Sequence, residues 1–242
     1  MTIAAVITAA GSGTRLGARS SDGTASRVSV PKALVPIEGK ALVAWAALRL
    51  TEVVDSVVVT APAAHLDAMR AALADAGVSA RVVVGGDTRQ ASVAAGLAAL
   101  DLDAQDIVLI HDAARAFQEP AVALATIEAV RDGADGAIPV LPVVDTLIRA
   151  PGPDGLIGDV VDRDELRIVQ TPQTFRAHVA IDAHTGAGGA AARPATDDAT
   201  LARARGHRIV AVDGHEWGFK VTRPGDLPLA RHIARSLAGG GA

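Results

Sequence analysis

Short apolar runs rich in valine and isoleucine alternate along the chain with longer segments of mixed polarity. The runs are continuous and do not alternate apolar with polar positions, which is typical of strands buried on both faces of a parallel sheet. We predict strands over Ala4–Ala9, Ser56–Thr60, Ala80–Val84, Asp106–His111, Gly136–Val140, Arg167–Thr171, Arg208–Val212 and Phe219–Thr222.

The segments between these runs carry apolar residues at helical spacing. They predict helices over Leu42–Leu50, Ala63–Ala76, Gln90–Leu100, Pro120–Arg131, Asp197–Arg205 and Asp226–Leu237. Thr196 is the expected N-cap of the fifth helix, and Gly206 suits its C-terminal end. Alternation of strand and helix up to Arg131 indicates right-handed βαβ units, and therefore an α/β fold with a doubly wound, mostly parallel sheet. Ligands of such sheets bind at the carboxyl ends of the strands.

Residues 141–164 interrupt this rhythm. Two apolar runs, Val143–Arg149 and Leu156–Val161, flank a turn rich in proline and glycine. We expect a β-hairpin that projects as an arm from a single domain spanning residues 1–242. Because an isolated hairpin is marginally stable, the arm is expected to pack against a second subunit.

Composition narrows the function. The net charge is −4 and no run of basic residues occurs, so a general nucleic-acid surface is not expected. Aromatic residues make up 2% of the chain, too few for base-stacking platforms, and the absence of cysteine excludes thiolate catalysis and disulfides. The apolar run at the N-terminus stops at Gly11, too early for a membrane span or a signal peptide. We expect a soluble, cytoplasmic protein.

A glycine-rich loop follows the first predicted strand, Ala9-Ala10-Gly11-Ser12-Gly13-Thr14-Arg15-Leu16. Glycines in such a loop let backbone N–H groups approach a phosphate. Leu16 occupies the third glycine position of a dinucleotide fingerprint, and the lysine of a P-loop is missing. The loop instead continues into Pro31-Lys32, so that Arg15 and Lys32 suit a nucleotide triphosphate. A tight turn with surface cations is the alternative.

Three further groups lie at predicted strand ends. Gly85-Gly86-Asp87 precedes a helix that contains Ser92. A cap of that helix is the alternative role for Asp87. His111-Asp112-Ala113-Ala114-Arg115 ends a very apolar strand. A mutual salt bridge between Asp112 and Arg115 is the alternative to ligand binding there, and it is disfavoured because ligands bind at this edge of the sheet. The last group comprises Arg163, Thr171-Pro172-Gln173, Thr196-Asp197-Asp198 and Lys220-Val221-Thr222.

The chain contains the motifs Ala-Ala-Gly-x-Gly-x-Arg, Pro-Lys, Gly-Gly-Asp-x-Arg-x-x-Ser-Val, His-Asp-Ala-Ala-Arg, Thr-Pro-Gln, Thr-Asp-Asp-Ala and Lys-Val-Thr-x-Pro-x-Asp. Taken together, these motifs resemble those of the 2-C-methyl-D-erythritol 4-phosphate cytidylyltransferases, and the resemblance extends from Ile3 to Leu227. The resemblance implies a Rossmann-like nucleotidyltransferase fold that joins CTP to the polyol phosphate and releases pyrophosphate. It implies catalytic roles for Arg15, Lys32 and Lys220. It assigns the nucleotide to Ala9, Ala10, Gly11, Gly13, Gly86, Asp87, Ser92 and Ala113. It assigns the acceptor to Asp112, Arg115, Thr146, Arg163, Thr171, Thr196 and Thr222.

The resemblance also implies Mg²⁺ bound mainly by phosphates, with Asp112 as a candidate ligand, and a homodimer in which Arg163 reaches the neighbouring subunit's acceptor. Two departures from the family pattern concern Ala116, where proline is usual, and the long stretch between Arg15 and Lys32. The alternatives are a cytidylyltransferase for another polyol phosphate, such as ribitol 5-phosphate, and a non-catalytic protein with this fold. A nicotinamide-dependent reductase is disfavoured by Leu16.

Overall fold

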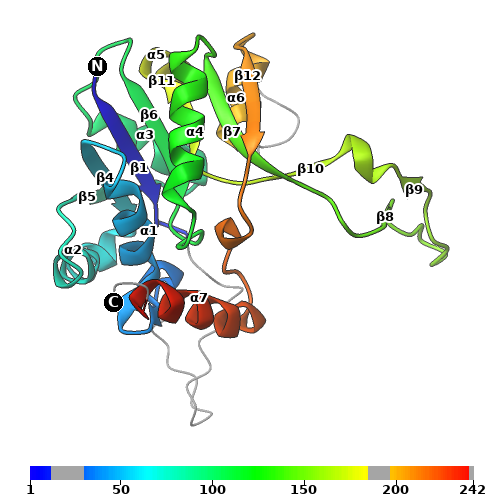
Figure 1. Cartoon of the computed structure of the whole chain (residues 1–242), viewed down its shortest axis with the longest axis horizontal. Helices are drawn as coiled ribbons and strands as arrows, with labels where there is room; N and C mark the ends of the chain where they lie inside the picture. The colour runs from blue at the N-terminus through cyan, green and yellow to red at the C-terminus, as the bar shows by residue number, and fades with distance from the viewer. Residues whose placement is uncertain (12–29, 185–196, 240–242) are drawn as a thin grey trace.

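The computed structural model describes residues 1–11, 30–184 and 197–239. Its centre is an eight-stranded sheet in the order β10-β7-β11-β6-β1-β4-β5, with β12 paired to β7 (Figure 1). The strands are β1 Ile3–Thr8, β4 Ser56–Ala61, β5 Arg81–Val84, β6 Ile107–Asp112, β7 Gly136–Pro142, β10 Arg167–Val169, β11 Gln173–Arg176 and β12 Ile209–Asp213.

The parallel half of the sheet explains the continuous apolar runs. Strands β6, β1, β4 and β5 run parallel to one another, and every residue of β6 is buried. Antiparallel β11 joins this half to β7, which pairs with antiparallel β10 and with parallel β12. The expected mostly parallel α/β sheet is therefore confirmed, with antiparallel strands inserted on one side.

Helices cover both faces of the sheet, as a doubly wound fold requires. Side chains of α1, α2 and α4 pack with Ala5 and Ile7 of β1, whereas α3, α5 and α6 pack with Val6 of β1. Helix α7 lies below the sheet and packs with Trp45 and Phe117. The helices are α1 Leu42–Thr51, α2 Leu66–Asp75, α3 Arg89–Ala98, α4 Pro120–Arg131, α5 Ala177–His184, α6 Asp198–Ala204 and α7 Leu227–Gly239.

Most predicted elements are confirmed to within a few residues, but one strand is wrong. Residues 219–222 form no strand. Val221 donates one backbone hydrogen bond to Ala114 O (2.9 Å), and its own carbonyl accepts from Lys32 Nζ (2.6 Å). The Lys32 side chain thus bonds the Val221 carbonyl, which the backbone of a neighbouring strand would bond in a sheet. Strand β11 and helix α5 were not predicted from the sequence. In β11 only Phe175 is apolar, and its buried neighbours Gln173 and Thr174 are polar, so the segment shows no apolar run.

The helix caps also differ from expectation. Asp197 is the N-cap of α6 and accepts from the backbone of Thr200, whereas Thr196 lies outside the described residues. Thr88, and not Asp87, caps α3 through its hydroxyl. Asp87 is therefore left available for another role.

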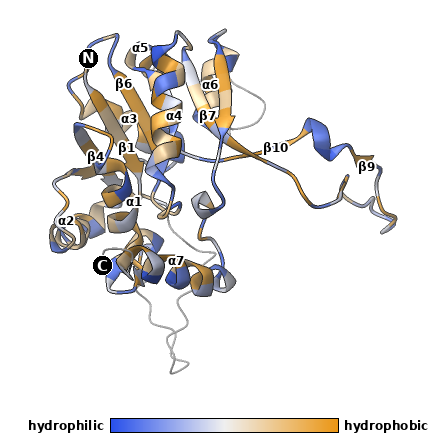
Figure 2. Cartoon of the chain, viewed as in Figure 1, coloured by the Kyte–Doolittle hydropathy of each residue, from blue (hydrophilic) through white to orange (hydrophobic). Residues whose placement is uncertain are grey.

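The predicted arm projects far from the sheet (Figure 1). Beyond β7, strands β8 Leu147–Ile148 and β9 Val160–Val161 pair antiparallel, so the hairpin is confirmed with shorter strands than expected. Apolar residues of this arm are exposed: Val144 is 75% and Ile157 79% accessible. Hydrophobic positions are correspondingly seen along the projecting arm as well as in the central sheet (Figure 2). A smaller hairpin, β2 Pro36–Ile37 and β3 Lys40–Ala41, precedes α1.

Candidate functional site

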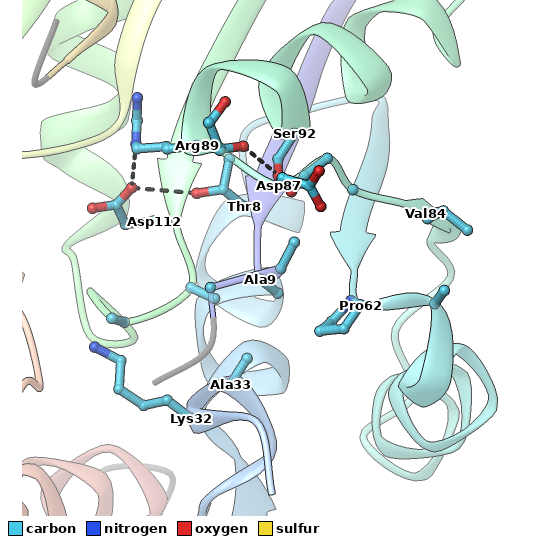
Figure 3. Close-up of a pocket in the computed structure, with 18 of the residues that line it drawn as sticks. Thr8, Ala9, Lys32, Ala33, Pro62, Val84, Asp87, Arg89, Ser92 and Asp112 are labelled. Carbon is cyan, nitrogen blue, oxygen red and sulfur yellow. Dashed lines mark hydrogen bonds and ion pairs between the residues drawn. The ribbon is translucent and has the colours of Figure 1, made fainter. Parts of the chain in front are cut away.

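A cavity of about 730 Å³ opens at the carboxyl ends of the parallel strands (Figure 3). This is the edge at which doubly wound sheets bind ligands. The end of β1 contributes Thr8 through Gly11, the loop after β5 contributes Gly85 through Thr88, and the tip of β6 contributes Asp112 through Ala114. Lys32 and Lys220 enter from segments remote in sequence. The glycine-rich loops and two of the three lysines of the chain therefore meet in one cavity.

One side of the cavity is built by close backbone approach. A Cβ atom on Gly85 would lie 2.5 Å from Cβ of Ala10 and 2.9 Å from Oγ of Ser92. Glycine is required here because the loop after β1 packs directly on the loop after β5. The Ser92 hydroxyl lies within hydrogen-bonding distance of Gly86 O (3.1 Å) and Thr88 O (2.9 Å), which ties the glycine loop to α3.

A charged group beside these loops centres on Asp112, whose Oδ1 also accepts from the Thr8 hydroxyl at 3.3 Å. Its Oδ2 accepts from Lys220 Nζ at 2.7 Å, and its Oδ1 accepts from Arg89 Nε at 3.1 Å. Burial alone would raise the pKa of Asp112, but the positive charges of Arg89, Lys220 and Arg115 outweigh it and hold this pKa well below its usual range. Asp112 is therefore a carboxylate that fixes two cations beside the cavity.

Arg89 continues this charged side into the protein. Its two terminal nitrogens donate to both oxygens of Asp198, at 2.8 and 2.7 Å. Asp198 is 1% exposed and also lies 3.1 Å from Nε2 of His184. Burial opposes the charge on Asp198, but His184 and Arg89 lower its pKa.

The buried His111 supports the tip of β6 from behind. Its Nε2 lies 3.2 Å from the carbonyl of Arg115, which can only accept, so Nε2 carries the proton. Nδ1 then accepts from the Thr171 hydroxyl (3.0 Å), whose oxygen accepts from the backbone N–H of Asp112 (3.1 Å). Neutral His111 thus holds both ends of the loop that presents Asp112.

We expect stability to fall on acidification because of His111. Burial lowers its pKa from 6.5 to about 4, so the unfolded state binds a proton in this window that the folded state does not. The free energy of unfolding therefore rises with pH between about pH 4 and pH 6.5, and above pH 6.5 His111 no longer lowers it. On acidification from pH 6.5 to about pH 4, the free energy of unfolding decreases by up to roughly 3 kcal/mol. Urea unfolding of the wild type and of His111→Gln across this range measures the difference.

Glutamine can donate to Arg115 O and accept from Thr171 without titrating, so the variant should lose this part of the pH dependence. The depressed pKa of Asp112 contributes near and below its ordinary value of 3.8, but Asp112 is present in both proteins, so the difference between them reports on His111. Identical slopes of stability against pH in the two proteins would rule out this role of His111.

The structure brings most of the predicted site residues together. Those that line the cavity are Ala9, Ala10, Gly11, Lys32, Gly86, Asp87, Ser92, Asp112, Ala113, Lys220 and Thr222. Gly13, Arg15 and Thr196 lie outside the described residues.

The remaining predicted residues lie elsewhere. Arg115 does not form the alternative salt bridge with Asp112; it donates to the carbonyls of Gly218 (2.7 Å) and Val169 (2.9 Å). Thr171 is 5% exposed and lies behind the cavity wall. Thr146 and Arg163 border a separate hollow of about 410 Å³ on the arm, where Arg163 donates to Val144 O (2.6 Å).

The contacts of Arg89, His184 and Gln173 were not predicted from the sequence. Gln173 Oε1 accepts from the backbone N–H groups of Asp198 (3.0 Å) and Ala199 (2.9 Å), which fixes the start of α6. Arg89 stands inside the Gly-Gly-Asp-x-Arg motif, but nothing local in the sequence indicates its partner 109 residues away. The two consecutive acids of the Thr-Asp-Asp-Ala motif were the available signal for an ion pair at this helix. Asp197 caps the helix, and Asp198 is left to pair with a cation.

The chain is similar over nearly its whole length to one family of known proteins. Residues 3–236 match the family model described as 2-C-methyl-D-erythritol 4-phosphate cytidylyltransferase. The chain is 44% identical over 238 residues to the protein of that name from Deinococcus radiodurans, covering 98% of this chain and 91% of the relative. A relative of the same name from Saccharopolyspora erythraea is 41% identical, with 96% and 99% coverage. The crystal structure of the Thermus thermophilus enzyme superposes with a TM-score of 0.75 at 34% identity, covering 97% of this chain and 100% of that one.

Proposed function

Because the chain belongs to the 2-C-methyl-D-erythritol 4-phosphate cytidylyltransferase family, we propose that it transfers CMP from CTP to 2-C-methyl-D-erythritol 4-phosphate in isoprenoid biosynthesis. A phosphate oxygen of the acceptor forms a bond to the α-phosphorus of CTP, and the bond to the β-phosphate breaks, releasing pyrophosphate. The observation that carries this proposal is that Lys32 and Lys220 line the same cavity as the two glycine loops.

The chemistry mainly requires charge neutralisation and positioning. Both reactants are polyanions, so cations must offset their repulsion as the two phosphates approach. The proposal assigns the nucleotide to the glycine side, with Gly86, Asp87 and Ser92 near its base and ribose. It assigns the acceptor to the side of Asp112 and Thr222. Lys220 then stands over the reacting phosphates, and Lys32 near the triphosphate, together with Arg15.

Mg²⁺ is part of the proposal. The described residues contain no group of three or more acidic or histidine side chains placed to hold an ion. Both oxygens of Asp112 already accept from cations, which disfavours this residue as a metal ligand. The cavity therefore fits an ion held by the phosphates of CTP, where it would supply further neutralisation of their charge.

A pyrophosphate-release assay tests the proposed reaction. CTP, UTP, ATP and GTP would each be combined with 2-C-methyl-D-erythritol 4-phosphate and with ribitol 5-phosphate. We expect release only with CTP and the methylerythritol phosphate. Faster release with ribitol 5-phosphate would favour the alternative acceptor, and no release with any pair would overturn the assignment.

The arm is proposed to form a homodimer. Exposed apolar side chains on it, including Leu156 (70%) and Ile157 (79%), are covered by nothing in the single chain that the structure describes. Their burial against a second subunit would offset the marginal stability of a hairpin. Dimerisation would also carry Thr146 and Arg163 toward the acceptor side of the neighbouring cavity.

We expect Ile157→Asp to shift the protein from dimer to monomer in sedimentation velocity, because a carboxylate would have to be buried at the contact. Activity at low protein concentration should fall with it. Leu229→Asp is the matched control, since Leu229 is an exposed apolar residue (50%) on α7. A wild-type protein that sediments as a monomer at micromolar concentration would contradict the proposed role of the arm.

The proposal also includes a cytoplasmic location. Among the described residues, every helix is too short or too polar to cross a bilayer. Fractionation of cells that express the tagged full chain tests the location, and recovery with membranes would contradict it.

A further inference from the structure

Arg89 connects the cavity wall at Asp112 with the buried start of α6, two places that are far apart in sequence. It is the first residue of α3, and its side chain lines the cavity beside Asp112 (Figure 3). Three of its N–H groups are used within the protein: Nε donates to Asp112, and the two terminal nitrogens donate to Asp198. These bonds account for its side chain being only 30% exposed at the edge of an open cavity.

The Asp112–Arg89–Asp198 bridge is attached at each end to a further element. Asp112 holds Lys220 by its other oxygen, at 2.7 Å. Asp198 lies in the first turn of α6, whose N-cap Asp197 directly follows the segment containing Thr196. Arg89 directly follows the Gly85–Thr88 loop in the chain, but within the described residues its side-chain hydrogen bonds go to Asp112 and Asp198 and not to the glycine loops.

We propose that Arg89 is a positioning residue for the acceptor half of the site, and that it sets Asp112, Lys220 and the start of α6 relative to one another. The inference rests on the proposed function, which assigns this half of the cavity to the polyol phosphate. The guanidinium acts through these partners, because its hydrogen bonds already go to carboxylates within the protein.

The role requires the shape of arginine as well as its charge. The planar guanidinium presents N–H groups along two edges, so one side chain meets Asp198 with both terminal nitrogens while Nε meets Asp112. A lysine at this position keeps the positive charge but offers one nitrogen, which cannot span both carboxylates. Arg89→Lys therefore separates two roles of Arg89: positioning by the shape of the guanidinium and neutralisation by its charge.

The kinetic test compares Arg89→Lys and Asp198→Asn with the wild type. We expect each variant to raise KM for the polyol phosphate and to lower kcat, with a combined loss in kcat/KM of roughly 10- to 100-fold, while KM for CTP is unchanged. The double variant should lose no more than the more severe single variant, because both changes break the same bridge. Arg70→Lys is the matched control, since Arg70 pairs with exposed Asp67 on α2, outside the cavity.

Wild-type kinetics in Arg89→Lys would overturn the inference, because charge alone would then suffice. An equal rise of KM for both substrates would also overturn it, since that indicates a general disturbance of the cavity. Full additivity of the two single changes would show that Arg89 and Asp198 act independently, which again contradicts a shared bridge.

A measurement without substrates keeps this test separate from the proposed function. In hydrogen exchange, the amides of α6 should exchange faster in Arg89→Lys than in the wild type or in Arg70→Lys. Unchanged protection of α6 would refute the bridge. Faster exchange in a protein that shows no transfer from CTP would instead leave the bridge intact and reject the assigned reaction.

Discussion

Replacing Lys220 by alanine is expected to lower kcat by roughly 10²–10³-fold, the effect of removing one preorganised charge from a transition state. The Lys220 ammonium group is held by Asp112 at the cavity wall, and the Lys220 side chain is 42% exposed, so it is both fixed and accessible to a ligand. Without this charge, the repulsion between the two polyanionic substrates is offset less, and the activation barrier for transfer rises. Steady-state kinetics with CTP and the methylerythritol phosphate measures the change.

Lys40→Ala is the matched control for this prediction. The three lysines of the chain are Lys32, Lys40 and Lys220, and only Lys40 lies away from the cavity, with its Nζ 5.0 Å from the ring centroid of Trp45. Its removal should leave kcat near the wild-type value, whereas Lys32→Ala should resemble Lys220→Ala. Near-normal turnover in both Lys32→Ala and Lys220→Ala would refute their assigned roles.

Asp112→Ala is expected to lower the free energy of unfolding by about 3–5 kcal/mol, the range for breaking a buried ion pair from one side. Asp112 is 8% exposed and pairs with Arg89 and Lys220, so its removal leaves the partly buried guanidinium without its second carboxylate. The depressed pKa of Asp112 has the same origin. Urea denaturation at neutral pH measures the loss.

Asp67→Ala provides the comparison, because Asp67 pairs with Arg70 on the surface and its side chain is 99% exposed. Exposed ion pairs contribute little, so this variant should unfold at nearly the wild-type urea concentration. A similar small effect in Asp112→Ala would mean that solvent already screens the ion pairs at the cavity wall. The charged side would then not be the rigid support described above.

Local pattern was sufficient to predict most of the elements. The runs around Val58 and Leu109 are apolar at nearly every position because both faces of their strands are covered, and this leaves a signal that needs no knowledge of the fold. The exception at residues 219–222 shows the limit of such reasoning. Its apolar character reflects burial of Val221 against α7, and not pairing in a sheet.

By itself, the sequence determined the doubly wound class, the projecting arm and the family, because periodicity and motifs are properties of neighbouring residues. It also placed the glycine loops and most of the cavity lining, since parallel strands bring their carboxyl ends to one edge. Only the tertiary structure decided the partners of the charged side chains. Asp112 meets Lys220 across 108 positions and Arg89 meets Asp198 across 109. Asp112 thereby pairs with Lys220 and Arg89 instead of the nearby Arg115. These pairings depend on how loops cross the edge of the sheet, which no local pattern encodes.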